Sequence, residues 1–398
     1  MFNSIFGKFT NVSFFQERLL SLFIYMGVLL IICFIIRRCK SCKSLKIILI
    51  LYLLILSIMG YFFIPAQAHD LSRLFIDMHN YDNYSINTFI PILLKSIRYS
   101  RDLLYFIVAK SHLDGLLPLS AVLISYSCIF YILYDYSKEN EISMKSVARA
   151  LFFIMLASNF GDTISGIRSM CAFSICAYCI YSELYKTKSF VNDLLLYFIA
   201  IGFHSVSIPI ILIRTMFLLI QKEKKVISRF FNIAILIIII FIGLRYGNII
   251  IEEALNKGTD YMANSDGFSW LFWGKMDSLI GMIIVSTVLL IIKKYEKSPL
   301  IEKCNIKKSN YHIMTIILYL TIVLFYFVED NVFYRFSSYM FFTISLPYML
   351  SYFELTTAKK SINHITKYDF IYYPLILILS VIQLSRGSLC GIKFFIFK

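Results

Sequence analysis

Long apolar runs, separated by short polar segments, recur along the whole chain of 398 residues. A helix needs about 20 mostly apolar residues to cross a hydrocarbon core about 30 Å thick. Runs of this kind predict about twelve transmembrane helices, at residues 18–36, 46–64, 115–134, 147–160, 166–182, 190–203, 205–220, 230–250, 273–292, 311–328, 336–353 and 368–385. The runs between 147 and 220 are short, so a pair of them is alternatively a re-entrant or tilted segment shielded by surrounding protein. The pattern predicts an all-α, multi-pass membrane protein.

The segments between these runs are too short for a separate soluble domain. There is no fixed-period repeat and no linker rich in Gly, Pro or Ser, so we expect one integral membrane domain over residues 1–398. The largest segment outside the predicted spans is 65–114. Its apolar run 101–109 is too short to cross a bilayer and is typical of a helix lying in the membrane interface.

Composition and charge support the membrane assignment. Hydrophobic residues make up 59% of the chain and charged residues only 16%, which leaves too little polar surface to cover a water-soluble globule. The net charge of +15 comes from Lys and Arg clustered in short loops, so it indicates topology rather than nucleic-acid binding. The nine cysteines include two Cys-x-x-Cys pairs, at 39–42 and 176–179, that lack the second half of a zinc site. We therefore expect free thiols, and neither a metal nor a cofactor.

The basic loops also predict orientation. The clusters at 37–46, 222–229 and 293–308 fall on one side when the chain is threaded through all twelve runs, and Lys and Arg are retained in the cytoplasm. The other side holds the 65–114 segment, the acidic loop 252–266 and the turn Glu329-Asp330. That side, with both termini, is expected to be outside; one miscounted helix between 147 and 220 would reverse part of this assignment.

Candidate site residues appear first in the external segment, directly after the second predicted span. If residues 69–79 are helical, Asp70 and Arg73 lie one turn apart, with Asp77 a further turn along the same face. Two carboxylates and a guanidinium would then share the membrane edge. The alternative is an ordinary exposed ion pair of little energetic value.

Three further candidates lie at other predicted outer turns. Arg168 begins a helix rich in small residues that permit close packing, and Arg335 begins another after Glu329-Asp330. His204 interrupts an apolar stretch, where an imidazole can exchange a proton near neutral pH. Structural alternatives are an arginine reaching the outer headgroups and a histidine satisfied within the fold. Because all these residues are expected at one bilayer depth on one side, the two arginines suit a multiply anionic phosphate group.

At these residues the chain resembles the EpsG/Wzy-type polysaccharide (O-antigen) polymerases of bacteria. The matching elements are Asp-Leu-x-Arg-x-aromatic (Asp70 to Phe75), Ile-Arg-x-x-x-Ala (Ile167 to Ala172) and Phe-His-Ser (Phe203 to Ser205). Phe75 stands where a tyrosine is common in the family, and Ser169 replaces a frequent glutamine.

The resemblance implies an inverting glycosyltransferase of GT-C-like architecture in the bacterial inner (cytoplasmic) membrane, with its active site facing the periplasm. It would transfer a growing glycan, such as that of lipopolysaccharide, from undecaprenyl diphosphate to a sugar hydroxyl of a new undecaprenyl-diphosphate-linked oligosaccharide. On this reading Arg168 and Arg335 hold the diphosphate, His204 or Asp70 takes the proton, Arg73 orients Asp70, and Asp77 contributes to substrate binding. The resemblance also allows two further partners, membrane lipid and a chain-length regulator.

Two other classes of protein remain open. A lipid-linked oligosaccharide flippase or another transporter would also have about twelve helices, but transporters place polar groups near the midplane on broken helices. A membrane acyltransferase would use His204 as its base, although no tight motif of histidine with an acidic partner is present. A glycan ligase is the remaining alternative.

Overall fold

The computed structural model describes residues 13–65, 70–158, 160–186, 190–220, 268–294, 310–328 and 330–358, with a few single positions between 233 and 378. All the regular elements within these ranges are helical. In chain order they are α2 (Ser13–Arg38), α3 (Cys42–Tyr61), α4 (Asp70–His79), α5 (Ile86–Lys95), α6 (Tyr99–Ser111), α7 (Leu116–Glu139), α8 (Met144–Ala157), α9 (Phe160–Ser165), α10 (Ile167–Ile180), the π-helix η1 (Tyr181–Tyr185), α11 (Phe190–Phe203), α12 (Ser207–Ile220), α14 (Phe268–Lys294), α16 (Asn310–Val328), α17 (Asp330–Arg335), the π-helix η4 (Phe336–Phe341) and α18 (Phe342–Ala358).

The all-α prediction is confirmed for the described residues. Within them, four helical segments are long and apolar enough to cross a membrane: Ser21–Arg38, Cys42–Tyr61, Leu116–Glu139 and Asn310–Phe327. The expected spans at 230–250 and 368–385 lie outside the described residues. The total of about twelve spans and the GT-C-like architecture therefore stay predictions.

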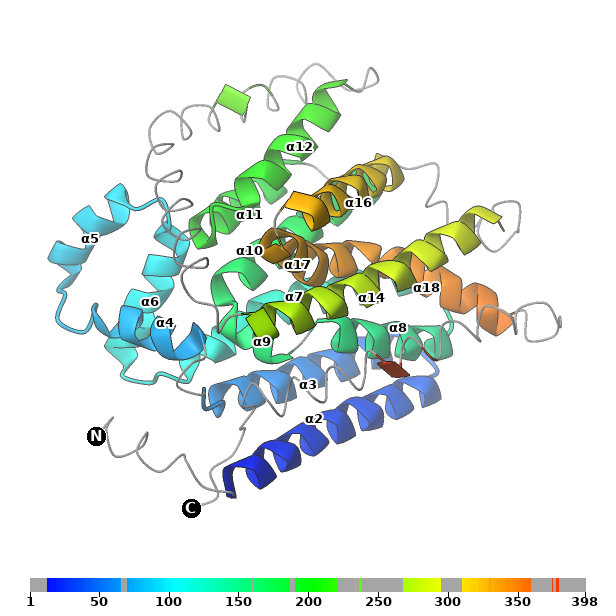
Figure 1. Ribbon diagram of the computed structural model, residues 1–398, viewed down its shortest axis with the longest axis horizontal. Helices are drawn as coiled ribbons and strands as arrows, with labels where there is room; N and C mark the ends of the chain where they lie inside the picture. Colours follow the sequence, from blue (N-terminus) through cyan, green and yellow to red (C-terminus); the bar gives the residue numbers. More distant parts are fainter. Residues whose placement is uncertain are drawn as a thin grey trace.

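The short helices predicted between 147 and 220 are present; α8 and α10 are buried along most of their length, whereas α11 and α12 expose Leu195, Met216 and Ile220. Helices α8, α10, α11 and α12 have 14 residues each, or about 21 Å, which is less than the hydrocarbon core needs. Helix α10 is lengthened by η1, and its small residues Cys171, Ala172, Ser174 and Ala177 are all buried. Small side chains let neighbouring helices approach closely, so α10 lies at the centre of the bundle (Figure 1).

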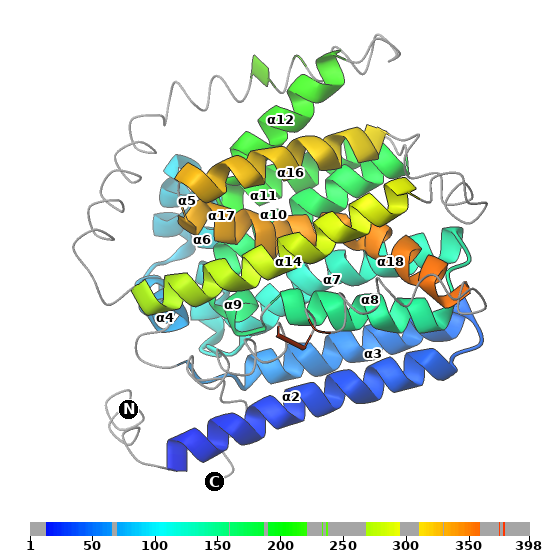
Figure 2. The ribbon, with the colours of Figure 1, turned by 45° about the vertical axis from the view of Figure 1, so that its right-hand side comes forward.

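The helices form layers that both ribbon views show. Helices α2 and α3 lie together on one side, α7 and α8 come next, and α12 lies farthest away (Figures 1 and 2). The Tyr25 hydroxyl donates to the Met155 carbonyl at 3.3 Å, and the Cys33 thiol donates to the Ala148 carbonyl at 3.5 Å. A residue later in α2 thus contacts a residue earlier in α8, so the two helices are antiparallel.

One end of the bundle is rich in basic side chains. The α7–α8 turn meets the end of α18 there, because the Ser143 backbone N–H donates to Glu354 Oε2 at 2.8 Å. Lys186 pairs there with Glu139 at 2.8 Å and with Asp135 at 3.1 Å. We call this the basic end; its basic residues include Arg37, Arg38, Lys40, Lys43, Lys138, Lys145, Arg149, Lys186, Lys293 and Lys294.

The opposite end carries the three short helices α4, α5 and α6 (Figure 1). The α9–α10 junction, the α11–α12 turn and α17 lie at this same end, because each connects helices whose other ends reach the basic end. We call it the capped end. Every sequence-predicted site residue falls on it.

A buried ion pair lies between η1 and α12. Arg214 Nε donates to Glu183 Oε2 at 2.7 Å, and a second nitrogen of the same guanidinium bonds Oε1. The Tyr197 hydroxyl donates to the same carboxylate at 3.3 Å. Arg214 is only 1% exposed. A charge at this depth is costly unless it is paired, so the bidentate contact accounts for the retention of both groups.

Candidate functional site

The 65–114 segment folds into three helices that pack on the end of the bundle. Helix α4 buries Leu71, Leu74, Phe75 and Met78, while its polar residues stay at the surface. This is the pattern of an amphipathic helix with one face on a core. Helix α6 covers the expected interfacial run 101–109, but it buries Asp102, Tyr105, Val108 and Ala109 against the protein. Helix α6 also exposes Leu103 and Ile107, and α5 exposes Ile86, Ile90, Ile92 and Leu94, so contact of the 101–109 helix with the membrane interface stays a prediction.

The first three candidates lie on α4. The Arg73 guanidinium donates to the Asp70 carboxylate one turn earlier, as the sequence predicts for a helix. The two side chains are 68% and 44% exposed, so the pair itself contributes under about 1 kcal/mol. Asp77 is also exposed. The pair therefore orients the Asp70 carboxylate more than it stabilises the cap.

Arg168 opens α10 and is half-buried. Among the described residues, its guanidinium forms no hydrogen bond or ion pair. It lies close enough to Asp70 of α4, to Arg98 and Arg101 of α6 and to the Tyr105 phenol for their charges to act on it. The structure thus brings Arg168 and Asp70 together, and it adds Arg101 and Tyr105 of α6 and the N-cap residue Arg98, which were not predicted as site residues.

His204 occupies the turn between α11 and α12. Its Nδ1 accepts a hydrogen bond from the Val206 backbone N–H at 3.1 Å, so a neutral ring carries its proton on Nε2. The Ser207 hydroxyl donates to the His204 carbonyl at 2.8 Å and begins the next helix. The turn therefore sets the tautomer of the neutral His204 ring.

Helix α6 is fastened to the end of α11 beside this histidine. The Tyr99 hydroxyl donates to the Phe198 carbonyl. Gly202 lies directly against the side chains of Tyr99 and Ser100, where a Cβ atom would collide with both. A glycine is required here by close packing, and the contact holds the Phe-His-Ser element against the cap.

Arg335 ends α17 and is half-buried. The hydroxyl of its neighbour Tyr334 donates to the buried carboxylate of Asp162 in α9. The next helical residue, Phe336, contacts Phe173 of α10 with ring centroids 4.9 Å apart. The arginine is therefore held on the segment that packs against the α9–α10 junction, which also carries Arg168.

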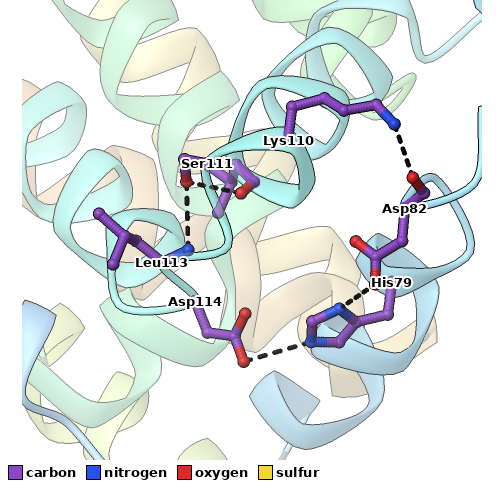
Figure 3. Close-up of polar contacts among 7 residues, drawn as sticks. His79, Asp82, Lys110, Ser111, Leu113 and Asp114 are labelled. Atoms are coloured by element: carbon purple, nitrogen blue, oxygen red, sulfur yellow. Dashed lines mark hydrogen bonds and ion pairs between the residues drawn. The ribbon is translucent and has the colours of Figure 1, made fainter. Parts of the chain in front are cut away.

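A second polar cluster lies at the edge of the cap (Figure 3). His79 Nδ1 faces Asp82 Oδ2 at 2.8 Å, and Nε2 faces Asp114 Oδ2 at 3.2 Å. The Lys110 ammonium donates to the Asp82 carbonyl at 2.6 Å. No role for His79 was predicted from the sequence. It joins the end of α4 to the loop before α5 and to the α6–α7 turn.

The His79 cluster predicts that the stability of the cap depends on pH. Partial burial alone lowers the pKa of His79, but the hydrogen bond to Asp82 and the charge of Asp114 outweigh it and raise the pKa above its ordinary value. The imidazolium donates to both carboxylates, whereas the neutral ring has one N–H. The stabilisation is fully present below about pH 6.5 and is lost as pH rises through the folded-state pKa.

We expect the backbone amides of α4 to exchange about five-fold faster at pH 8.5 than at pH 6, after correction for intrinsic rates. This factor corresponds to the loss of about 1 kcal/mol, the usual contribution of a partly exposed charged contact. Hydrogen exchange with mass spectrometry measures this. A His79→Gln control should show no such pH dependence. Equal corrected rates at both pH values in the unmodified protein would contradict the assignment.

No group of three or more His, Cys, Asp or Glu side chains suited to a metal ion occurs within the part of the chain that the structure describes. Seven described cysteines have free thiols: Cys33, Cys39, Cys42, Cys128, Cys171, Cys176 and Cys179. The candidate residues at the capped end are arginines, carboxylates, the His204 imidazole and the Tyr105 phenol.

Comparison with known proteins relates the chain to a family. A family model described as the EpsG family matches residues 116–394. No curated protein and no solved structure matches the chain. The matched range includes Arg168, His204 and Arg335, and it starts after α4 to α6, so Asp70 and Arg73 precede it.

Proposed function

Because the chain belongs to the EpsG family of membrane proteins of polysaccharide biosynthesis, we propose that it polymerises lipid-linked oligosaccharide repeat units, as in O-antigen or exopolysaccharide. The donor is a growing glycan on undecaprenyl diphosphate, and the acceptor is a sugar hydroxyl of a new lipid-linked unit. A bond forms between the acceptor oxygen and the anomeric carbon, and the bond from that carbon to the diphosphate breaks. The acceptor proton passes to a base, and the lipid diphosphate leaves.

One observation carries this proposal: Asp70, Arg168, His204 and Arg335 come from separate segments and all lie at the capped end. The basic end holds the clustered Lys and Arg residues that are retained in the cytoplasm. The capped end is then periplasmic in a bacterial inner membrane, where lipid-linked units are joined. A site at the edge of the bundle also suits a substrate that stays anchored in the bilayer.

In the proposed mechanism Arg168 and Arg335 bind the diphosphate. A guanidinium grips phosphate oxygens bidentately and stabilises the charge that builds as the leaving group departs. Arg168 suits this role because, within the described residues, no carboxylate forms an ion pair with it. Its donors remain available to an anionic substrate.

The base in this mechanism is Asp70. A base needs a lone pair, but His204 Nδ1 already accepts the Val206 N–H, and Nε2 carries the proton in the neutral ring. We assign His204 as a hydrogen-bond donor to the substrate. The Asp70 carboxylate, oriented by Arg73, accepts the proton, and Asp77 contributes a contact to the acceptor sugar. Attack opposite the departing diphosphate inverts the anomeric centre in one displacement.

Variants of these two residues separate their roles. We expect Asp70→Asn to lower the rate of chain growth about 10²- to 10⁴-fold, the usual contribution of a general base. His204→Gln keeps an N–H donor and should retain more activity than His204→Ala. Radiolabelled sugar incorporation into polymer in membranes measures both. The assignment of the base is wrong if Asp70→Asn polymerises normally while His204→Gln is as inactive as His204→Ala.

Deleting the gene tests the class of function. A polymerase mutant loses the ladder of surface polysaccharide while single repeats, still on the carrier, reach the outer face. Loss of all external repeats would instead identify a flippase, and accumulation of finished polymer on the carrier would identify a glycan ligase. Normal polysaccharide would remove the whole proposal.

A further inference from the structure

One face of α6, whose charged groups act on Arg168, holds a feature that the roles above leave unexplained. Arg98, Arg101 and Tyr105 are spaced three and four residues apart, so they share one face of the helix. The Arg101 guanidinium lies over the Tyr105 ring, 5.5 Å from its centroid. The charges of Arg98 and Arg101 and the phenol of Tyr105 all act on Arg168. Three guanidinium groups and one phenol are thus gathered from α6 and α10.

The Tyr105 hydroxyl is the distinctive member. The side chain is 1% exposed, and its hydroxyl oxygen has no hydrogen-bond partner in the described part of the protein. A buried polar group without a partner is unfavourable, and few such groups occur in folded proteins. The charges that act on this phenol belong to Arg168, Arg101, Asp77 and Asp102. The hydroxyl therefore lies among the charged groups of the candidate site.

The phenol also has the right protonation state for a donor. Burial raises the pKa of Tyr105 well above its ordinary value, while the charges of Arg168 and Arg101 only partly oppose this. The group keeps its proton at physiological pH, so it can donate one hydrogen bond to an incoming acceptor. An anion that enters among the arginines would supply that acceptor and relieve their mutual repulsion.

The arrangement around Arg101 holds this face in place. Arg101 Nε donates to Asp102 Oδ1 at 2.7 Å, and the Ser96 hydroxyl donates to the buried Asp102 carboxylate. The Arg98 backbone N–H donates to Ser96 Oγ at 3.0 Å. These contacts fix the first turn of α6 before any ligand binds. The geometry is preorganised, which favours binding because little order has to be gained.

We infer that α6 forms the second wall of the diphosphate site, with the Tyr105 hydroxyl donating a hydrogen bond to a phosphate oxygen of the lipid carrier and Arg98 and Arg101 supplying positive charge opposite Arg168. This inference rests on the proposed function for the identity of the carrier. It assigns a binding role to residues that lie before the matched family range.

The test measures binding of undecaprenyl diphosphate to the purified full chain in nanodiscs, without any sugar transfer. Loss of one hydrogen bond to a charged group predicts that Tyr105→Phe binds the carrier about ten- to hundred-fold more weakly. Its thermal stability without carrier should be equal to or higher than that of the unmodified protein, because the deleted hydroxyl has no partner. A purely structural role would lower stability and leave affinity unchanged.

Tyr52→Phe is the matched control. Tyr52 in α3 is also fully buried with an unpartnered hydroxyl, and it stacks on Phe130 inside the bundle. It should show the same stability behaviour and unchanged binding. Arg98→Gln should weaken binding and reduce its salt dependence, because one charge is removed from the site.

Wild-type affinity in Tyr105→Phe, or equal weakening in Tyr52→Phe, would overturn the inference. A parallel arm uses phosphatidylglycerol, and a loss confined to that lipid would also overturn it, since the site would then hold an ordinary phospholipid headgroup. If the unmodified protein binds the carrier through Tyr105 but joins no repeat units, this inference stands and the polymerase proposal fails.

Discussion

Replacing Arg168 by alanine is expected to abolish growth of the polysaccharide while leaving the protein folded and inserted. Removal of one donor that stabilises developing charge typically costs about 10²- to 10³-fold in rate. Folding should survive, because no described carboxylate forms an ion pair with Arg168 and the like-charged Arg98 and Arg101 lie near it. The same loss is expected for Arg335→Ala. The polysaccharide ladder on a gel and the membrane content of the variant measure the two halves of the result.

A matched control for this experiment is Arg149→Ala. Arg149 is also half-buried, but it lies at the basic end, where Nη1 contacts Thr356 and Thr357 at 3.5 and 3.4 Å. Its loss should leave the ladder unchanged. Normal ladders from both Arg168→Ala and Arg335→Ala would remove the assignment of the diphosphate to these arginines.

Breaking the buried pair of Glu183 and Arg214 is expected to have the largest effect on stability. Glu183→Gln leaves the Arg214 guanidinium, 1% exposed, without its bidentate carboxylate. Removing one partner of a buried ion pair costs about 3–5 kcal/mol, which is a large part of the stability of a typical domain. The variant should be depleted in membranes, and its thermal midpoint in detergent should fall. Fluorescence-detected size exclusion after heating measures both.

A double variant shows whether the loss of stability comes from an uncompensated buried charge or from a simple loss of contacts. Arg214→Met together with Glu183→Met removes both charges and keeps apolar volume, so it should recover most of the stability. A double-mutant cycle gives the coupling between the two positions. Single variants as stable as the unmodified protein, or a double variant as unstable as the sum of the singles, would contradict this account of the pair.

The helices that the sequence predicts best are those whose signal is local. Apolar length alone locates α2, α3, α7 and α16, and the expected segment 190–203 coincides with α11. The pair of Glu183 and Arg214 was not predicted, because its partners are 31 residues apart and meet only when η1 packs on α12. A π-helix also leaves no clear pattern in the apolar spacing, so η1 and η4 appeared as ordinary helix.

The predicted topology was sufficient to place some of the candidate site residues at one end of the bundle, but it did not identify the others. Counting predicted spans places Asp70, Arg168, His204 and Arg335 on one side, and the structure has all four at the capped end. Arg101 and Tyr105 were missed because their run 101–109 was interpreted as a helix lying in the membrane interface, and Arg98 was missed because it lies outside that run. Only the packing of α6 against α4 and α11 turns these residues toward Arg168. The tautomer of His204 likewise depends on a turn contact that no sequence pattern reveals.

The most direct measurement of the central claim uses the purified protein in nanodiscs with one undecaprenyl-diphosphate-linked repeat unit, followed by mass spectrometry. The proposed function predicts lipid-linked glycans of two and more repeats, with one free undecaprenyl diphosphate released for every new glycosidic bond. It also predicts that Arg168→Ala yields neither product. Repeat units that stay single in the presence of intact protein, or carrier released without any lengthening of the glycan, would contradict it.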